Sequence, residues 1–263
     1  MTEETVKIEI EDENANETLD ENVEFVDNVE HLEYLNENNV KGDKNMESNN
    51  KTVVNDFQDE KLVNIGLEDE EMDLFFILDR SGSMYGTEND TINGFNAFIE
   101  KQLARNHNIR VTTILFDGKY EVLYSRKPIH EVRPLTREDY FVRGSTALLD
   151  AIGRTITTYE REVNSAMCVI TTDGYENASR EFSRIQIRNM IKNCGWEFVY
   201  IGADIDSYGE ASRIGIRQSR VANYSKSSVG IDNMYDAVDK VTARFYETRD
   251  INDEHVEWKK DLD

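Results

Sequence analysis

Cysteine is scarce in this sequence, and that scarcity excludes two kinds of site. The chain of 263 residues holds two cysteines. Cys168 lies in an apolar run and Cys194 ends a helical pattern, so the pair fits neither a disulfide framework nor a zinc-binding motif. We therefore expect both thiols to be reduced and buried.

Long apolar runs are missing as well. No segment approaches the roughly 18 consecutive apolar residues that cross a bilayer. The N-terminus, MTEETVKIEIEDE, lacks the basic and apolar regions of a signal peptide. From the sequence alone we expect a cytoplasmic protein with no membrane partner.

Basic residues are outnumbered. Lysine and arginine total 30 against 53 aspartates and glutamates, which gives a formal charge of −23, and most of the excess lies before residue 72. A surface this negative repels phosphate backbones and anionic lipid, because binding to them depends on lysine and arginine. We expect no nucleic-acid partner.

The charge pattern divides the chain into three parts. Residues 1–70 are rich in Glu, Asp and Asn and poor in large apolar groups, which predicts a mostly disordered acidic tail. Residues 71–250 contain the apolar runs expected of one folded domain, and 251–263 are predicted to form a short polar C-terminal tail. Four apolar residues of the acidic tail recur at helical spacing. They predict either a short helix that binds a partner or no more than residual apolar content in a disordered segment. They are Phe25, Val29, Leu32 and Leu35.

From Met72 onward, apolar runs typical of strands alternate with segments of helical spacing. The run MDLFFILD predicts a central strand buried on both faces, and Asp117-Gly118 predicts a hairpin turn between two further strands. The alternation predicts an α/β fold with a doubly wound, mainly parallel sheet, one antiparallel edge strand and helices on both faces. The expected helices lie near 92–103, 146–163, 182–192, 208–213 and 229–246, and the further strands within 110–125, 165–173 and 195–204.

Three segments that carry oxygen ligands fall where such a fold places its functional crevice, beyond the carboxyl ends of the strands. Segment 79–83 (DRSGS) follows the first strand, 171–174 (TTDG) ends the fourth, and 143–146 (RGST) opens a helix. None supplies a thiolate or an imidazole. Hydroxyl and carboxylate oxygens suit Mg²⁺ or Mn²⁺ and suit zinc or copper poorly.

These segments resemble the metal-ion-dependent adhesion site of von Willebrand factor A domains. The resemblance rests on Asp79-x-Ser81-x-Ser83 after an apolar strand, a threonine at the head of a later helix, and an Asp-Gly pair after the next strand. It covers about residues 72–248. The stretches RGSTALLDAI and TTDGYENASREF are similar to the small intracellular bacterial and phage branch of that family.

The resemblance implies a role for each residue. Ser81, Ser83 and Thr146 would lie in or beside the coordination sphere of a Mg²⁺ or Mn²⁺ ion. Asp79 and Asp173 would act directly or through bound water. Neutral hydroxyls leave the charge of the ion only partly balanced, so its open coordination position would attract a Glu or Asp of a partner protein.

Each assignment has a plainer alternative. Asp79, Ser81 and Ser83 are residue types that cap helices, and Thr146 is a common first residue of one. Asp173 suits a turn with the glycine that follows it.

Other polar residues receive structural roles. The resemblance implies that Arg80 projects outward as a contact residue. We expect Asp204 and Asp206 to cap a helix, because both follow a strand. The four histidines form no cluster and are expected at the surface; they are His31, His107, His130 and His255.

The expected function is therefore binding of a protein, without catalysis. An alternative is an assembly scaffold whose site is structural or empty. A second is a Mg²⁺-dependent phosphohydrolase of the haloacid-dehalogenase type, which needs an Asp two residues after Asp79, where this chain has Ser81. A further hypothesis is autoinhibition, in which a carboxylate of the acidic tail fills the open metal position.

Overall fold

A computed structural model describes residues 71–251 and 256–262. These residues form one sheet and the helices that cover it. Within these residues the sheet has six strands in the order β3-β2-β1-β4-β5-β6. Only β3 runs antiparallel, paired with β2 at one edge. The strands are β1 (Met72–Asp79), β2 (Ile109–Phe116), β3 (Tyr120–Pro128), β4 (Ala166–Thr172), β5 (Glu197–Ala203) and β6 (Val221–Tyr224).

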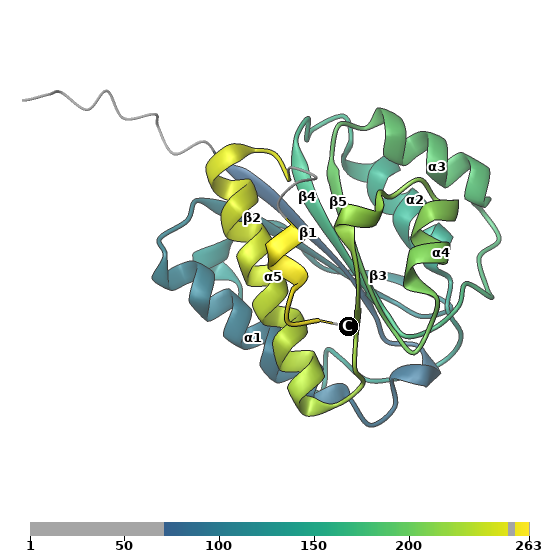
Figure 1. The fold of residues 1–263 in the computed structure, drawn as a ribbon, viewed down its shortest axis with the longest axis horizontal. Coiled ribbons are helices and arrows are strands. Elements are labelled where there is room, and N and C mark those ends of the chain that lie inside the picture. The colour runs from purple at the N-terminus through teal and green to yellow at the C-terminus, as the bar shows by residue number, and fades with distance from the viewer. Residues whose placement is uncertain (1–70, 252–255, 263) are drawn as a thin grey trace, which may run out of the picture. The chain divides into compact units, whose positions relative to one another are not determined.

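Helices cover both faces of the sheet, as predicted. α1 and α5 pack on one face, and α2, α3 and α4 pack on the other (Figure 1). Their bounds are α1 (Glu88–Ala104), α2 (Leu148–Tyr159), α3 (Arg184–Asn193), α4 (Ser207–Arg213) and α5 (Ser228–Thr248). None of the described helices is long and apolar enough to span a membrane.

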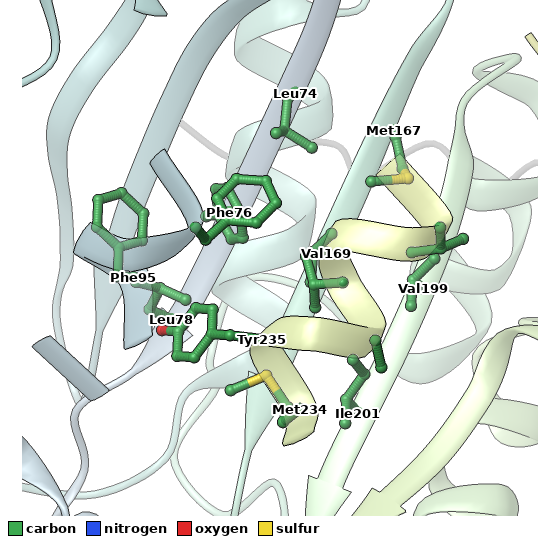
Figure 2. Packing of buried hydrophobic residues seen from close by; sticks show 14 of the residues in the cluster. Leu74, Phe76, Leu78, Phe95, Met167, Val169, Val199, Ile201, Met234 and Tyr235 are labelled. Carbon is green, nitrogen blue, oxygen red and sulfur yellow. The ribbon is translucent and has the colours of Figure 1, made fainter. Parts of the chain in front are cut away.

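The run MDLFFILD forms the central strand because its side chains are apolar on both sides. Leu74, Phe76 and Leu78 join the core under α1 and α5, whereas Phe75 and Ile77 join the core under α2. In Figure 2, Phe76 lies beside Phe95 of α1, with ring centroids 5.3 Å apart in an edge-to-face arrangement. Each large side chain buried here contributes about 1.5–3 kcal/mol to folding, so β1 is held rigidly in place.

Several element bounds differ from the sequence expectation. The helix expected over 146–163 is shorter and begins at Leu148, and β6 was not anticipated. The last described residues form a short 3₁₀ helix, and Trp258 and Leu262 pack into the α5 core. The predictions for the acidic tail, namely disorder, a short helix or residual apolar content, and autoinhibition, concern residues 1–70, which lie outside the described residues.

Two expectations about single side chains need correction. Cys168 is buried, but Cys194 is only partly buried, because it follows the last turn of α3; both thiols are free. His130 is exposed, whereas the ring of His107 is partly buried and stacks on Tyr246 at 3.9 Å between centroids.

Candidate metal centre

The candidate site lies at the point where the strand order reverses. β1 pairs with β2 on one side and with β4 on the other. The chain leaves β1 toward α1 on one face and leaves β4 toward α3 on the opposite face. Asp79 ends β1 and Asp173 directly follows β4, so the two carboxylates lie at this divergence, where open α/β sheets bind ligands.

Asp79 is a buried acid held by hydrogen bonds. Its side chain accepts one from the Ser81 backbone N–H at 2.6 Å and one from the Thr172 hydroxyl at 2.5 Å. Burial raises the pKa of its carboxyl to about 6, against the lowering effect of these hydrogen bonds. A neighbouring cation would favour the ionised form of such a group.

Ser81, Ser83 and Asp173 form a continuous line of oxygens. The two serine hydroxyls lie 3.1 Å apart, and the Ser83 hydroxyl donates to Asp173 Oδ1 at 2.5 Å. Ser81 and the Asp173 side chain are buried, whereas Ser83 is exposed. The line therefore runs from the end of β1 to the end of β4 and opens to solvent at Ser83.

The hydroxyls of Thr146 and Ser83 both lie close to Gly174. A Cβ at Gly174 would lie 2.7 Å from the Thr146 hydroxyl and 3.2 Å from the Ser83 hydroxyl. A side chain at Gly174 would displace the Thr146 hydroxyl and crowd the Ser83 hydroxyl. Farther along the same loops, the Gly82 N–H donates to the Gly144 carbonyl at 3.1 Å. The three segments predicted from sequence thus converge.

The helix-capping alternative does not describe these residues. The N-cap of α1 is Thr87, and Ser81 precedes a short 3₁₀ turn without a side-chain capping bond. The N-cap of α2 is Ala147, one residue beyond Thr146. None of the four candidate ligands on these two loops, Asp79, Ser81, Ser83 and Thr146, therefore caps α1 or α2, and the hydroxyls of Ser81 and Ser83 contact each other instead.

Similarity to solved structures is confined to the fold. No family model matches the sequence, and no curated protein does. Proximal thread matrix protein 1 from the mussel byssus, "with zinc occupied MIDAS motif", matches with a TM-score of 0.50 at 17% identity over 65% of this chain and 46% of that chain. The D319A mutant of the PilB minor pilin from Streptococcus sanguinis matches with a TM-score of 0.53 at 12% identity, over 69% of this chain and 64% of that chain.

A third match is the pilus adhesin SpaC from Lactobacillus rhamnosus GG in an open conformation, with a TM-score of 0.54 at 12% identity over 67% of this chain and 30% of that chain. The fold is like that of von Willebrand factor A (vWA) domains. The chain spans less than two thirds of each of these proteins, and at such identities the likeness establishes the arrangement of strands and helices.

Arg80 does not project outward as the resemblance implied. Its side chain is fully buried, and its guanidinium donates to Asp117 at 3.1 Å and to Glu121 at 2.6 Å. Arg143 also donates to Asp117, at 2.7 Å. Asp117 lies in the β2–β3 turn, so this buried ion pair fastens the 79–83 loop to the hairpin beside it.

Sequence reasoning missed two polar groups at the site. Thr172 supplies the hydroxyl that holds Asp79. Lys226, in the loop between β6 and α5, places its ammonium nitrogen 2.7 Å from Asp173 Oδ2 and donates to the Ser83 carbonyl at 2.5 Å. Thr172 was marked by its place at the end of an apolar strand, but nothing in the sequence marked Lys226.

Of the two aspartates after β5, one behaves as expected. Asp206 is the N-cap of α4 and accepts from the Gly209 N–H at 3.0 Å. Asp204 is exposed and has a left-handed backbone, with φ of 57°, so it turns the chain and does not cap the helix.

The donor set fits a small hard cation. It consists of three hydroxyls and two carboxylates, which are ligand types that Mg²⁺ and Mn²⁺ accept. Within residues 71–251 and 256–262, no three His, Cys, Asp or Glu side chains gather as a metal cluster. A cation at these loops would therefore be held mainly by hydroxyls. The residues are Asp79, Ser81, Ser83, Thr146 and Asp173.

Proposed function

We propose that this domain is a non-enzymatic protein-binding module that holds Mg²⁺ or Mn²⁺ and engages a Glu or Asp of its partner. Ser81, Ser83 and Thr146 supply hydroxyl ligands, and Asp79 and Asp173 act directly or through water. The observation that carries the proposal is that three loops, distant in sequence, bring their oxygens together at the switch point of the sheet, where the strand order reverses between β1 and β4.

Charge explains why such a site would recruit an acidic partner. When bound, the cation supplies an electrophilic position that takes a further oxygen ligand. Three of the five candidate ligands are neutral hydroxyls, which balance little of its charge. A carboxylate from outside therefore gains a strong electrostatic interaction at a site partly shielded from water.

The loops around the site also offer aromatic surface to a partner. Tyr85 is 81% exposed, Tyr175 is 51% exposed and Phe141 is 41% exposed. Each lies within a few residues of a candidate ligand or of the loop that carries one, and the Arg143 guanidinium lies 4.9 Å above the centre of the Phe141 ring. Tyrosine, tryptophan and arginine are enriched at the residues that dominate protein interfaces.

Chemistry at the site favours binding over catalysis. The position two residues after Asp79 holds Ser81, whose hydroxyl cannot serve as the carboxylic acid of a phosphohydrolase. Among the described residues, the two histidines lie away from the site hydroxyls, since His107 precedes β2 and His130 follows β3, at the opposite end of the sheet. These facts support a module whose ligands hold a cation and a partner.

Capture of partners with and without metal tests the proposed function. Immobilised full-length protein is incubated with lysate of its source cell in Mg²⁺, in Mn²⁺ and in EDTA, and retained proteins are identified by mass spectrometry. We expect a specific set that the wild type retains with metal and releases with EDTA, and that Asp79→Asn fails to retain. Recovery of the same proteins from EDTA-treated protein and from the variant would show that the metal mechanism is wrong.

The aromatic residues provide a second arm of the same experiment. The double variant Tyr85→Ser/Tyr175→Ser is expected to lose the captured proteins while keeping its Mg²⁺ affinity within about twofold of the wild type, because neither residue supplies a proposed ligand. Ile185→Ser is the matched control, since Ile185 is 75% exposed but lies on α3. If the control loses the partner as readily as the double variant, the aromatic surface has no special role.

A further inference from the structure

The loop between β6 and α5 brings a lysine to the candidate metal centre. Lys226 Nζ lies 2.7 Å from Asp173 Oδ2, and it donates a hydrogen bond to the Ser83 carbonyl at 2.5 Å. The Asp173 side chain is fully buried, and the Lys226 side chain is 24% exposed. The ammonium group therefore contacts two residues that belong to the proposed metal site, one from each side of the sheet's switch point.

The position of this lysine is fixed by its neighbours. Ser227 caps α5 by accepting from the Gly230 N–H at 3.1 Å, and its own N–H donates to the Ser225 carbonyl at 2.8 Å. β6 ends at Tyr224, so the loop is short and is tied to a strand and a helix at its two ends. Holding a strongly hydrated ammonium group against a buried carboxylate is favourable only when the two charges compensate each other.

We propose that Lys226 is the resident cation of the site, which balances the charge of Asp173 and competes with the divalent metal for it. This inference rests on the proposed function. Asp173 Oδ2 makes no hydrogen bond among the described residues, so the ion pair with Lys226 is its main compensation. Without that positive charge, two acidic groups would face each other across the loops.

Metal binding then becomes an exchange of cations. A divalent ion at the hydroxyls of Ser81 and Ser83 lies close to the ammonium group, and the two positive charges repel each other. Loading the site requires Lys226 to leave Asp173, and release of the metal lets it return. The three loops keep their arrangement in both states, because a positive charge is present in each.

Replacement of the lysine separates these roles. In full-length protein, Lys226→Met removes the charge at similar length, Lys226→Arg keeps it, and Lys240→Met is a control because Lys240 pairs with Asp261 on the surface. Isothermal titration calorimetry with MgCl₂ and MnCl₂ gives the affinity, and thermal melts in EDTA and in saturating Mg²⁺ give the stability.

We expect Lys226→Met to bind Mg²⁺ about tenfold more tightly than the wild type or better, to melt at a lower temperature in EDTA, and to recover that loss in saturating Mg²⁺. Lys240→Met should stay within about twofold of wild-type affinity, and Lys226→Arg, which keeps the positive charge, should bind Mg²⁺ less tightly than Lys226→Met. Wild-type or weaker affinity in Lys226→Met would overturn this inference alone. If neither the wild type nor Lys226→Met binds a divalent ion, the proposed function fails together with it.

Discussion

Asp79→Asn is expected to weaken Mg²⁺ and Mn²⁺ binding by about 100-fold or more, because it removes a negative charge next to the proposed ion while keeping the side-chain shape. The fold should be at least as stable as the wild type at pH 7. Burial raises the pKa of Asp79 to about 6, so its ionised form costs the folded state free energy that a neutral amide does not. Isothermal titration calorimetry and thermal melts measure the two effects.

Asp73→Asn is the matched control for that variant. Asp73 is buried in the same strand at its opposite end, where its carboxylate pairs with Arg126 at 2.8 and 3.1 Å. This variant should lose stability and keep its metal affinity. Wild-type metal binding by Asp79→Asn, or an equal loss of binding in both variants, would remove Asp79 from the site.

Arg80→Met is expected to destabilise the protein by about 3 kcal/mol, because it removes a buried positive charge and leaves the carboxylates that pair with it uncompensated. Arg80 is the link between the 79–83 loop and Asp117 of the β2–β3 turn. Urea unfolding followed by circular dichroism measures the change in the free energy of unfolding.

Arg143→Met provides the comparison, because it donates to the same Asp117 carboxylate but its side chain is 38% exposed. Solvent screens this pair, so its loss should cost less than about 1 kcal/mol. If the two variants lose equal stability, or if Arg80→Met stays within about 1 kcal/mol of the wild type, Arg80 does not have the structural role assigned to it.

The sequence was sufficient to predict five of the six strands and the loops at the carboxyl ends of β1 and β4. Apolar runs such as Met72–Asp79 identify buried strands without any tertiary information. In a parallel sheet the carboxyl ends of neighbouring strands share one edge, so the placement of candidate ligands after β1 and β4 followed from chain order. The vWA-like fold and its antiparallel edge strand were confirmed.

What the sequence did not reveal depends on contacts between distant segments. β6 has four residues, and it is a strand because it pairs with β5 rather than because of its own pattern. Lys226 follows that unrecognised strand, so its approach to Asp173 had no local signal. The burial of Arg80 depends on Asp117, which reaches it from a separate hairpin.

The start of α2 shows the same limit. A threonine before an apolar helical segment predicts an N-cap, yet the helix begins at Leu148. The backbone of Thr146 is instead paired with the loop after β4: its N–H donates to the Asn177 side chain at 3.0 Å, and its carbonyl accepts from the Asn177 N–H at 3.0 Å. The cytoplasmic location, the phage-type branch, the three-part division of the chain and the role of the acidic tail stay predictions.

Anomalous diffraction from crystals of the full-length protein grown with MnCl₂ tests the central claim most directly. We expect a manganese peak in direct contact with the hydroxyl oxygens of Ser81 and Ser83, next to Thr146, with the Lys226 ammonium group moved away from Asp173. Ordered loops without a peak at saturating Mn²⁺, or a peak bound only elsewhere on the protein, would contradict it.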